Sequence, residues 1–416
     1  MKKLTVFLLV FYFIFSLSGI SAETQAQVQA NTQAQAQSQM KASESEKKFI
    51  LGNIKDKIEA VLNTVQNADF QSGLNLSLRG IDYSIENAEI LGNNAELLSL
   101  AAASMQALSQ NADLNSLNEE KIAEISGKII EIFKNFDDEN VKIAAVDCLS
   151  KFPGAKWNGT IDVLNDYLEK RYRENHPGNL LIGNVINSLG EFGDSRSFSL
   201  VFNIWLNEIW PEYRTATENS LVNLAQNSFE NANKAVFFSD NPTILKFFTL
   251  MKKSGKNNKN FLGNLAEKSL SYAINNAESK QEFPPVFFMI QKETLETLAS
   301  AKWSRAEETV LKNFSVAKKE YETKIIDDGE FIEIIELTAK FSSPKIAEKL
   351  SKLLGEFNLS AEKTEIPSEP VTLALIKSLG ELGDKTAFDN LLYVTYLNYS
   401  EKVIAQAKDS LAKLKW

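Results

Sequence analysis

Few side chains in this sequence are of the types that carry out enzymatic chemistry. The 416 residues include one histidine, His176, and one cysteine, Cys148. A disulfide scaffold needs pairs of cysteines, a structural zinc needs about four Cys or His ligands, and a histidine-based triad would have to use the single imidazole. His176 stands in a loop-like segment and Cys148 on an apolar stripe. We expect a surface or structural histidine, a cysteine in the core, no metal and no cofactor.

Two acidic clusters have the residue types of an acid–base pair or a calcium site. They are residues 137–139 (Asp-Asp-Glu) and residues 327–330 (Asp-Asp-Gly-Glu). Both stand where a helix is expected to begin, and a carboxylate there stabilises the positive end of the helix dipole. Neither has the alternating oxygen ligands of a calcium loop. We therefore expect both clusters to cap helices.

Aromatic side chains provide the candidates for binding. Residues 198–210, FSLVFNIWLNEIW, are apolar at nine of thirteen positions, whereas one buried stripe needs about half. The surplus indicates either a helix packed between neighbouring repeats, which we favour, or a surface that binds a partner. Aromatic residues are enriched at binding hot spots because they bury much area for little lost rotamer entropy. The candidate binding residues are Trp205, Trp210, Tyr213, Tyr393 and Tyr396.

The elements that must position these residues are helices. From residue 48 onward, apolar residues recur three and four positions apart, and alternation at period two is nearly absent. This spacing predicts an all-α fold. Between 215 and 330 the loops differ in length but the helical spacing continues. The helices expected there are Thr217–Phe229, Pro242–Lys253, Phe261–Ala277 and Thr294–Tyr321.

One phrase occurs twice. VINSLGEFGD at 185–194 returns as LIKSLGELGD at 375–384, identical at seven of ten positions. A glycine can adopt the left-handed conformation that ends a helix, and an aspartate can cap the helix that follows, so we expect this phrase to join the two helices of a hairpin. The separation of 190 residues divides into about five units of 38, within the range of helical solenoids. The predicted turn and capping residues are Gly193, Asp194, Gly383 and Asp384.

The segments KSLGELGDKTAFDNLL, NSLGEFGDSRSFSLV and DENVKIAAVDCLSKF resemble HEAT repeats. They resemble especially the short, bilin-lyase type, in which a helix ends in Leu-Gly-x-Leu-Gly-Asp. This resemblance implies an α-α superhelix, a solenoid of antiparallel helical hairpins whose second helices line a concave surface that holds other macromolecules. The mid-helix proline and the Asp-to-Arg ladder of the longer eukaryotic repeats are missing. We assign HEAT-like repeats to 119–416, and an N-terminal helical cap or degenerate repeats to 48–118, which match by period alone.

The first 22 residues have the pattern of a bacterial secretory signal peptide. Lys2 and Lys3 precede an apolar run, and small residues follow up to Ala22, after which we expect cleavage. Ile20 departs from the small residue preferred two places before the cut, and 4–22 is also long enough to remain as a membrane anchor. The sequence therefore predicts a periplasmic protein, with a form anchored in the inner membrane as the alternative.

The next segment, 23–47, consists largely of Gln, Ala and Ser without apolar periodicity, which predicts a disordered tether, or else a fluctuating helix. The net charge of −9 disfavours nucleic acid as a partner. We expect a non-enzymatic scaffold of the cell envelope that binds another protein and meets the membrane only through an uncleaved signal segment. The alternative is a carboxylate-dependent enzyme or enzyme subunit on the same scaffold, because glycan cleavage needs neither His nor Cys.

Overall fold

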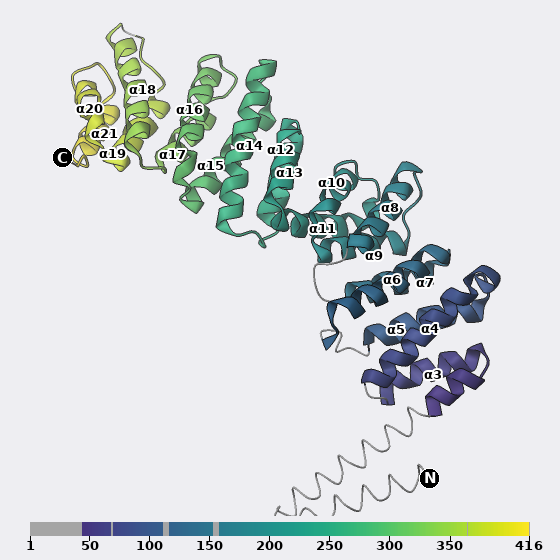
Figure 1. Ribbon diagram of the computed structural model, residues 1–416. Helices are drawn as coiled ribbons and strands as arrows, with labels where there is room; N and C mark the ends of the chain where they lie inside the picture. The colour runs from purple at the N-terminus through teal and green to yellow at the C-terminus, as the bar shows by residue number, and fades with distance from the viewer. Residues whose placement is uncertain (1–43, 68–69, 111–115, 153–157, 364, 416) are drawn as a thin grey trace, which may run out of the picture. The chain divides into compact units, whose positions relative to one another are not determined.

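The computed structural model describes residues 44–67, 70–110, 116–152, 158–363 and 365–415. The predicted signal peptide and residues 23–43 of the predicted tether lie outside these ranges, whereas 44–51 form a helix. The described secondary structure is helical apart from one isolated β-bridge, between Asp384 and Lys415. The prediction of an all-α fold is therefore confirmed (Figure 1).

The chain divides into two compact units, with the boundary between Phe192 and Gly193. The boundary falls inside the range 119–416 that was assigned to one set of repeats. After the helix at 44–51, the helices of the first unit are α3 (Ile54–Asn67), α4 (Phe70–Leu91), α5 (Ala95–Gln110), α6 (Glu119–Asn135), α7 (Glu139–Ser150), α8 (Asn158–Arg173) and α9 (Leu180–Phe192).

The helices of the first unit form two layers. One layer contains α3, α5, α7 and α9, which contact one another in succession, and the other contains α4, α6 and α8. Across the layers, α4 packs on α5, α6 on α7 and α8 on α9. Each hairpin therefore consists of an even-numbered first helix and an odd-numbered second helix.

The second unit has the same alternation over more helices. Its α-helices are α10 (Phe198–Leu206), α11 (Arg214–Asn227), α12 (Phe229–Phe237), α13 (Asn241–Lys253), α14 (Lys259–Lys280), α15 (Pro285–Ala301), α16 (Glu307–Glu322), α17 (Asp328–Ala339), α18 (Pro344–Glu362), α19 (Glu369–Leu382), α20 (Phe388–Val394) and α21 (Glu401–Leu411). Short 3₁₀ turns are η2 (Ser195–Ser197), η3 (Pro211–Tyr213), η4 (Ser304–Ala306) and η5 (Lys385–Ala387). The helices α11 to α21 with odd numbers contact one another in succession, and buried apolar side chains form a continuous core from Phe198 to Leu414.

The repeated phrase occupies the turns after α9 and α19. Gly193 and Gly383 have φ of +64° and +67°, in the left-handed region that glycine adopts without a Cβ clash. The side chains of Asp194 and Asp384 accept hydrogen bonds from the backbone amides two residues later and so cap η2 and η5. A Cβ atom on Gly193 would lie 2.0 Å from Nδ2 of Asn227.

The expectation that this phrase joins the two helices of one hairpin is wrong at its second occurrence. The helix after the turn, α20, packs mainly on α18 and α21, while α19 packs on α17, α18 and α21. The Gly-Asp turn thus leads from the second helix of one hairpin to the first helix of the next. Sequence alone does not distinguish the two kinds of turn, because both require the same end and start signals.

Two predicted helices end earlier than apolar spacing indicated. The segment 198–210 is helical only as far as Leu206, because Glu208 has a φ of +49° and Pro211 begins η3. The range Thr294–Tyr321 was expected to be one helix, but it contains parts of α15 and α16. Lys302, with a φ of +54°, ends α15. The buried side chain of Trp303 then donates a hydrogen bond to Glu267, which fixes the corner.

Candidate functional site

The predicted aromatic residues of 198–213 lie in α10 and in the turn that leads to α11, and the structure brings Trp205 and Trp210, but not Tyr213, to one small pocket. Trp205 is 4% exposed, and its ring packs against those of Phe202 and Phe247, with centroids 5.6 and 6.1 Å away. Trp210 is 3% exposed, and Tyr213 is half-buried. Both tryptophans are buried, as expected from the favoured interpretation of this segment as a helix packed between its neighbours. Their rings therefore contribute mainly to the core.

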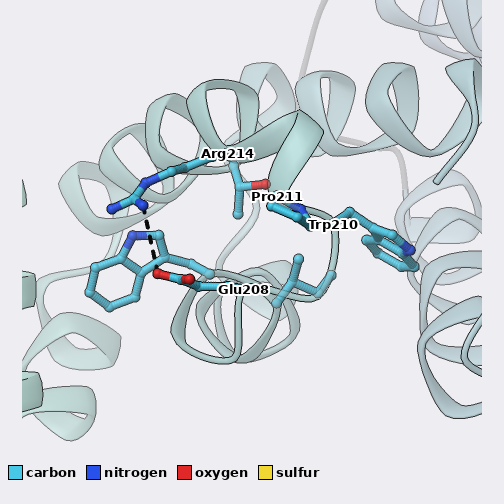
Figure 2. Close-up of a pocket in the computed structure, with 7 residues that line it drawn as sticks. Glu208, Trp210, Pro211 and Arg214 are labelled. Carbon is cyan, nitrogen blue, oxygen red and sulfur yellow. Dashed lines mark ion pairs between the residues drawn. The ribbon is translucent and has the colours of Figure 1, made fainter. Parts of the chain in front are cut away.

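A small pocket remains beside these tryptophans. Figure 2 shows Glu208, Trp210, Pro211 and Arg214 around it, with the Arg214 guanidinium facing the Glu208 carboxylate at 3.6 Å. Its volume of about 30 Å³ admits about one water molecule. The indole Nε1 of Trp205, which also lines the pocket, is buried and has no hydrogen-bond partner among the described residues. A water molecule is thus the ligand that this space fits.

Charged residues surround the tryptophan cluster on its open side. The Lys246 ammonium lies 4.9 Å from the centre of the Trp205 ring and 3.1 Å from Glu208. This hydrogen bond from Lys246, with the charge of the same lysine, lowers the pKa of Glu208. A wider depression of about 480 Å³, lined in part by Arg214, Lys246 and Lys253, adjoins the cluster. A partner in this depression would meet these cations beside the indole ring of Trp205.

The second predicted set of aromatic residues is more accessible. Tyr396 is 76% exposed and Tyr393 is 39% exposed, and the Tyr393 hydroxyl is hydrogen-bonded to Glu362. Tyr399 is buried, and its hydroxyl donates to Oδ1 of Asn358 at 3.3 Å. Burial raises the pKa of Tyr399 to about 12. Of the five candidate binding residues, Tyr396 offers the largest exposed fraction to a partner.

The acidic clusters cap helices. The Asp138 side chain accepts from the backbone amide of Val141 at the start of α7. Asp327 and Glu330 form a reciprocal capping box at the start of α17. Cys148 is buried as a free thiol, and burial raises its pKa. Among the described residues, no group of three or more His, Cys, Asp or Glu side chains is arranged to hold a metal ion.

A buried carboxyl group on α16 was missed by the sequence analysis. Glu320 is 1% exposed, and burial raises its pKa to about 7. Nε2 of Gln291, on α15, donates to Oε2 of Glu320 at 2.9 Å, while Oε1 of Gln291 is buried without a partner among the described residues. The signal in the sequence was an acid at helical spacing from the apolar residues Val310, Phe314 and Ala317.

A polar groove crosses the second helices of the first unit, and it too was missed. It has a volume of about 680 Å³, and its described lining comes from α5, α7 and α9. Five amide side chains contribute to this lining: Gln106, Gln110, Asn140, Asn184 and Asn187. On each helix the lining residues are three or four positions apart, so they share one face. The sequence shows polar residues at these positions, but their alignment depends on the stacking of the three helices.

Comparisons with known proteins add little to this geometry. No family model matches the chain, and no curated protein matches it. One similar solved structure is described as "Computational Design of Self-Assembling Cyclic Protein Homooligomers"; it is 10% identical, with 76% of this chain and 93% of that chain covered. Its TM-score of 0.12 is too low to support an argument about fold or function. The resemblance to HEAT repeats rests on the motifs in the sequence.

Proposed function

We propose that the protein is a non-enzymatic scaffold, a HEAT-like helical solenoid that binds another protein through the second helices of its hairpins. The observation that carries this proposal is the packing of each helix on its nearest neighbours in an alternating two-layer order, within each unit. An array built in this way buries a core between successive repeats and leaves one long face free for binding.

Ion pairs between successive hairpins support the repeat interpretation. Lys252 of α13 pairs with Glu293 of α15 at 2.7 Å, and Lys292 of α15 pairs with Glu333 of α17 at 2.8 Å. Both pairs join residues 41 positions apart. This separation is close to the repeat length of about 40 residues that is typical of HEAT arrays.

The enzyme alternative is less well supported by the described carboxyl groups. Among these groups, a raised pKa is found for Asp147 and Glu320, in both cases chiefly because of burial. Asp147 belongs to the first unit and Glu320 to the second. Glu320 is also enclosed by the core, so a substrate does not reach it in this conformation. Glycan cleavage would require two carboxyl groups about 5 to 9 Å apart on either side of a bound sugar.

Export to the periplasm remains part of the proposal because of the pattern in residues 1–22. No described helix is long and apolar enough to cross a membrane. N-terminal sequencing of protein purified from the cells that produce it distinguishes the two proposed forms. A start at Glu23 identifies the cleaved periplasmic form, a start at Met1 identifies the anchored form, and a cytosolic location excludes both.

Site-specific photo-crosslinking in the producing cells tests the scaffold proposal. A crosslinking amino acid is introduced at exposed positions on second helices, namely Gln106, Lys253 and Lys377. Exposed positions on first helices, Lys134 and Glu308, serve as matched controls. The proposal expects adducts of one partner protein at the first set and few at the second. It is wrong if no position yields an adduct with another protein, and the assigned face is wrong if both sets react equally.

A further inference from the structure

We propose that the groove across α5, α7 and α9 of the first unit binds an extended polypeptide segment through its backbone amide groups. This inference rests on the proposed function, because it specifies the kind of partner that one face of the scaffold receives. The polar residues that line the groove include Gln106 and Gln110 on α5, Asn140 and Asp147 on α7, and Asn184, Asn187 and Glu191 on α9. Its volume, about 680 Å³, lies within the usual range for ligand sites.

The amide side chains match the chemistry of a peptide backbone. Each Asn or Gln side chain provides two donor hydrogens and one acceptor oxygen, which suit the C=O and N–H groups of an extended chain. The side chains of Gln106, Asn140, Asn184 and Asn187 have no hydrogen-bond partner among the described residues. They are exposed or half-exposed, so a ligand in the groove can replace the water around them.

The spacing of the helices matches the repeat of an extended chain. Helices α5 and α7 are in contact, as are α7 and α9, and packed helices lie about 8 to 10 Å apart. An extended chain advances about 3.3 Å per residue, so it meets a new helix about every third residue. A segment of about seven residues is therefore long enough to cross all three helices, each of which contributes at least one amide side chain to the groove lining.

The corresponding layer of the second unit differs in a way that supports this assignment. There charged side chains of neighbouring helices pair with each other, as in Lys252–Glu293 between α13 and α15 and Lys292–Glu333 between α15 and α17. A ligand would have to break these ion pairs. Among the described residues, the groove of the first unit is lined by amide side chains rather than by such a ladder, and those of Gln106, Asn140, Asn184 and Asn187 have no partner there that a ligand would have to displace.

The charges of the groove favour a basic side chain on the bound segment. Asp147 and Glu191 line it together with one base, Lys151. Burial raises the pKa of Asp147, while the charge of Lys151 lowers it by a smaller amount. A lysine or arginine of the ligand would offset the partial desolvation of Asp147. We therefore expect the preferred segment to carry a basic residue next to Asp147.

A polypeptide fits the lining better than a glycan does. Sugar rings present apolar faces that favour flat aromatic side chains, and the described lining has no aromatic residue. Instead, Ala102, Ile143 and Ala144 provide small apolar patches between the amides. In an extended chain alternate side chains point to the same face, so such patches receive every second side chain.

Selection from a phage library of random linear nonapeptides against the purified full chain tests this inference. The best nonapeptide is synthesised with a fluorophore, and its affinity is measured by anisotropy for the wild type, for Asn184→Ala with Asn187→Ala, and for Asn63→Ala. Alanine favours helix more than asparagine does, so the double variant should fold, which circular dichroism checks. Asn63 is an exposed asparagine on α3 that does not line the groove.

The inference expects a loss of affinity of about tenfold or more in the double variant and no change in Asn63→Ala, since each lost hydrogen bond weakens binding severalfold. It also expects Asp147→Asn to weaken binding of peptides that carry a basic residue. It is overturned if no peptide is selected, if the double variant binds as the wild type does, or if a hexamer of N-acetylglucosamine occupies the groove instead. The photo-crosslinking experiment detects a partner protein on either layer of helices, so its result does not depend on whether this groove binds a peptide. The scaffold proposal and the groove proposal can therefore fail separately.

Discussion

Replacing Glu320 with glutamine should stabilise the protein at alkaline pH and have little effect at acidic pH. The residue Glu320 is 1% exposed, and the pKa of its carboxyl group, about 7, is well above the ordinary glutamate value of 4.5. Desolvation is the main cause, because burial disfavours the charged form. When the group is protonated, its O–H can donate to the buried and otherwise unpartnered Oε1 of Gln291.

The sign of the pH effect follows from the two pKa values. Below about pH 4.5 the carboxyl group is protonated in both the folded and the unfolded chain, and the native contacts of Glu320 are fully favourable. As the pH rises from about 4.5 to 7, the unfolded chain releases its proton first, so the free energy of unfolding decreases. The loss is complete above pH 7. One pKa unit corresponds to 1.36 kcal/mol, so a difference of about 2.5 units amounts to about 3 kcal/mol.

Glutamine at position 320 keeps an oxygen that accepts from Nε2 of Gln291, and its amide hydrogens can donate to Oε1 of Gln291. It does not ionise. We therefore expect Glu320→Gln to exceed the wild type in unfolding free energy by about 2 to 3 kcal/mol at pH 8, and by less than about 1 kcal/mol at pH 4.5.

Urea unfolding of the full chain at several pH values provides the measurement. Hydrogen exchange identifies the transition that involves α15 to α17, because a chain with two compact units need not unfold in one step. Glu336→Gln is the matched control, since it removes one acid from an exposed position on α17. The reasoning is refuted if Glu320→Gln and the wild type keep the same stability difference at pH 4.5 and pH 8, or if the control shows the same change.

Three further predictions concern local features. In thermal or urea unfolding, Gly193→Ala should destabilise the second unit by about 1 to 2 kcal/mol, because an alanine is strained at positive φ. The control, Gly127→Ala in an exposed turn of α6, should be neutral or should stabilise the first unit by up to about 1 kcal/mol, because alanine favours helix more than glycine does. Asp138→Ala should cost about 1 kcal/mol by removing the cap of α7, while Asp137→Ala should change the unfolding midpoint little. Cys148 should react with a thiol reagent such as DTNB only when urea opens the core, because the buried thiol forms little thiolate.

Each of these predictions has a result that would contradict it. Equal effects at Gly193 and Gly127 would mean that backbone conformation does not control the turn after α9. If Asp137→Ala loses more unfolding free energy than Asp138→Ala does, Asp137 and not Asp138 provides the cap of α7. Rapid labelling of Cys148 in buffer without urea would show that the first unit opens readily around α7.

Local sequence signals were sufficient for the helical fold and for its turns and caps. Apolar residues that recur three and four positions apart predict helices. The positive φ values at Gly193 and Gly383 occur where the sequence Leu-Gly-x-x-Gly-Asp ends a helix. The caps formed by Asp138 and Asp327 were likewise readable, because a cap involves only residues within one turn. Helix ends were less predictable when a corner depended on a distant contact, as at Trp303, whose indole bonds to Glu267.

The sequence by itself therefore determined an all-α chain with its start and stop signals, because these depend on interactions within a few residues. The tertiary structure decided which side of each helix is buried: it enclosed Trp205 and Glu320, left Tyr396 exposed and brought the amides of α5, α7 and α9 into one groove. The physical reason is that burial and alignment depend on helices about 40 residues apart in the chain. Their register is set by the packing of whole faces, which no short stretch of sequence specifies.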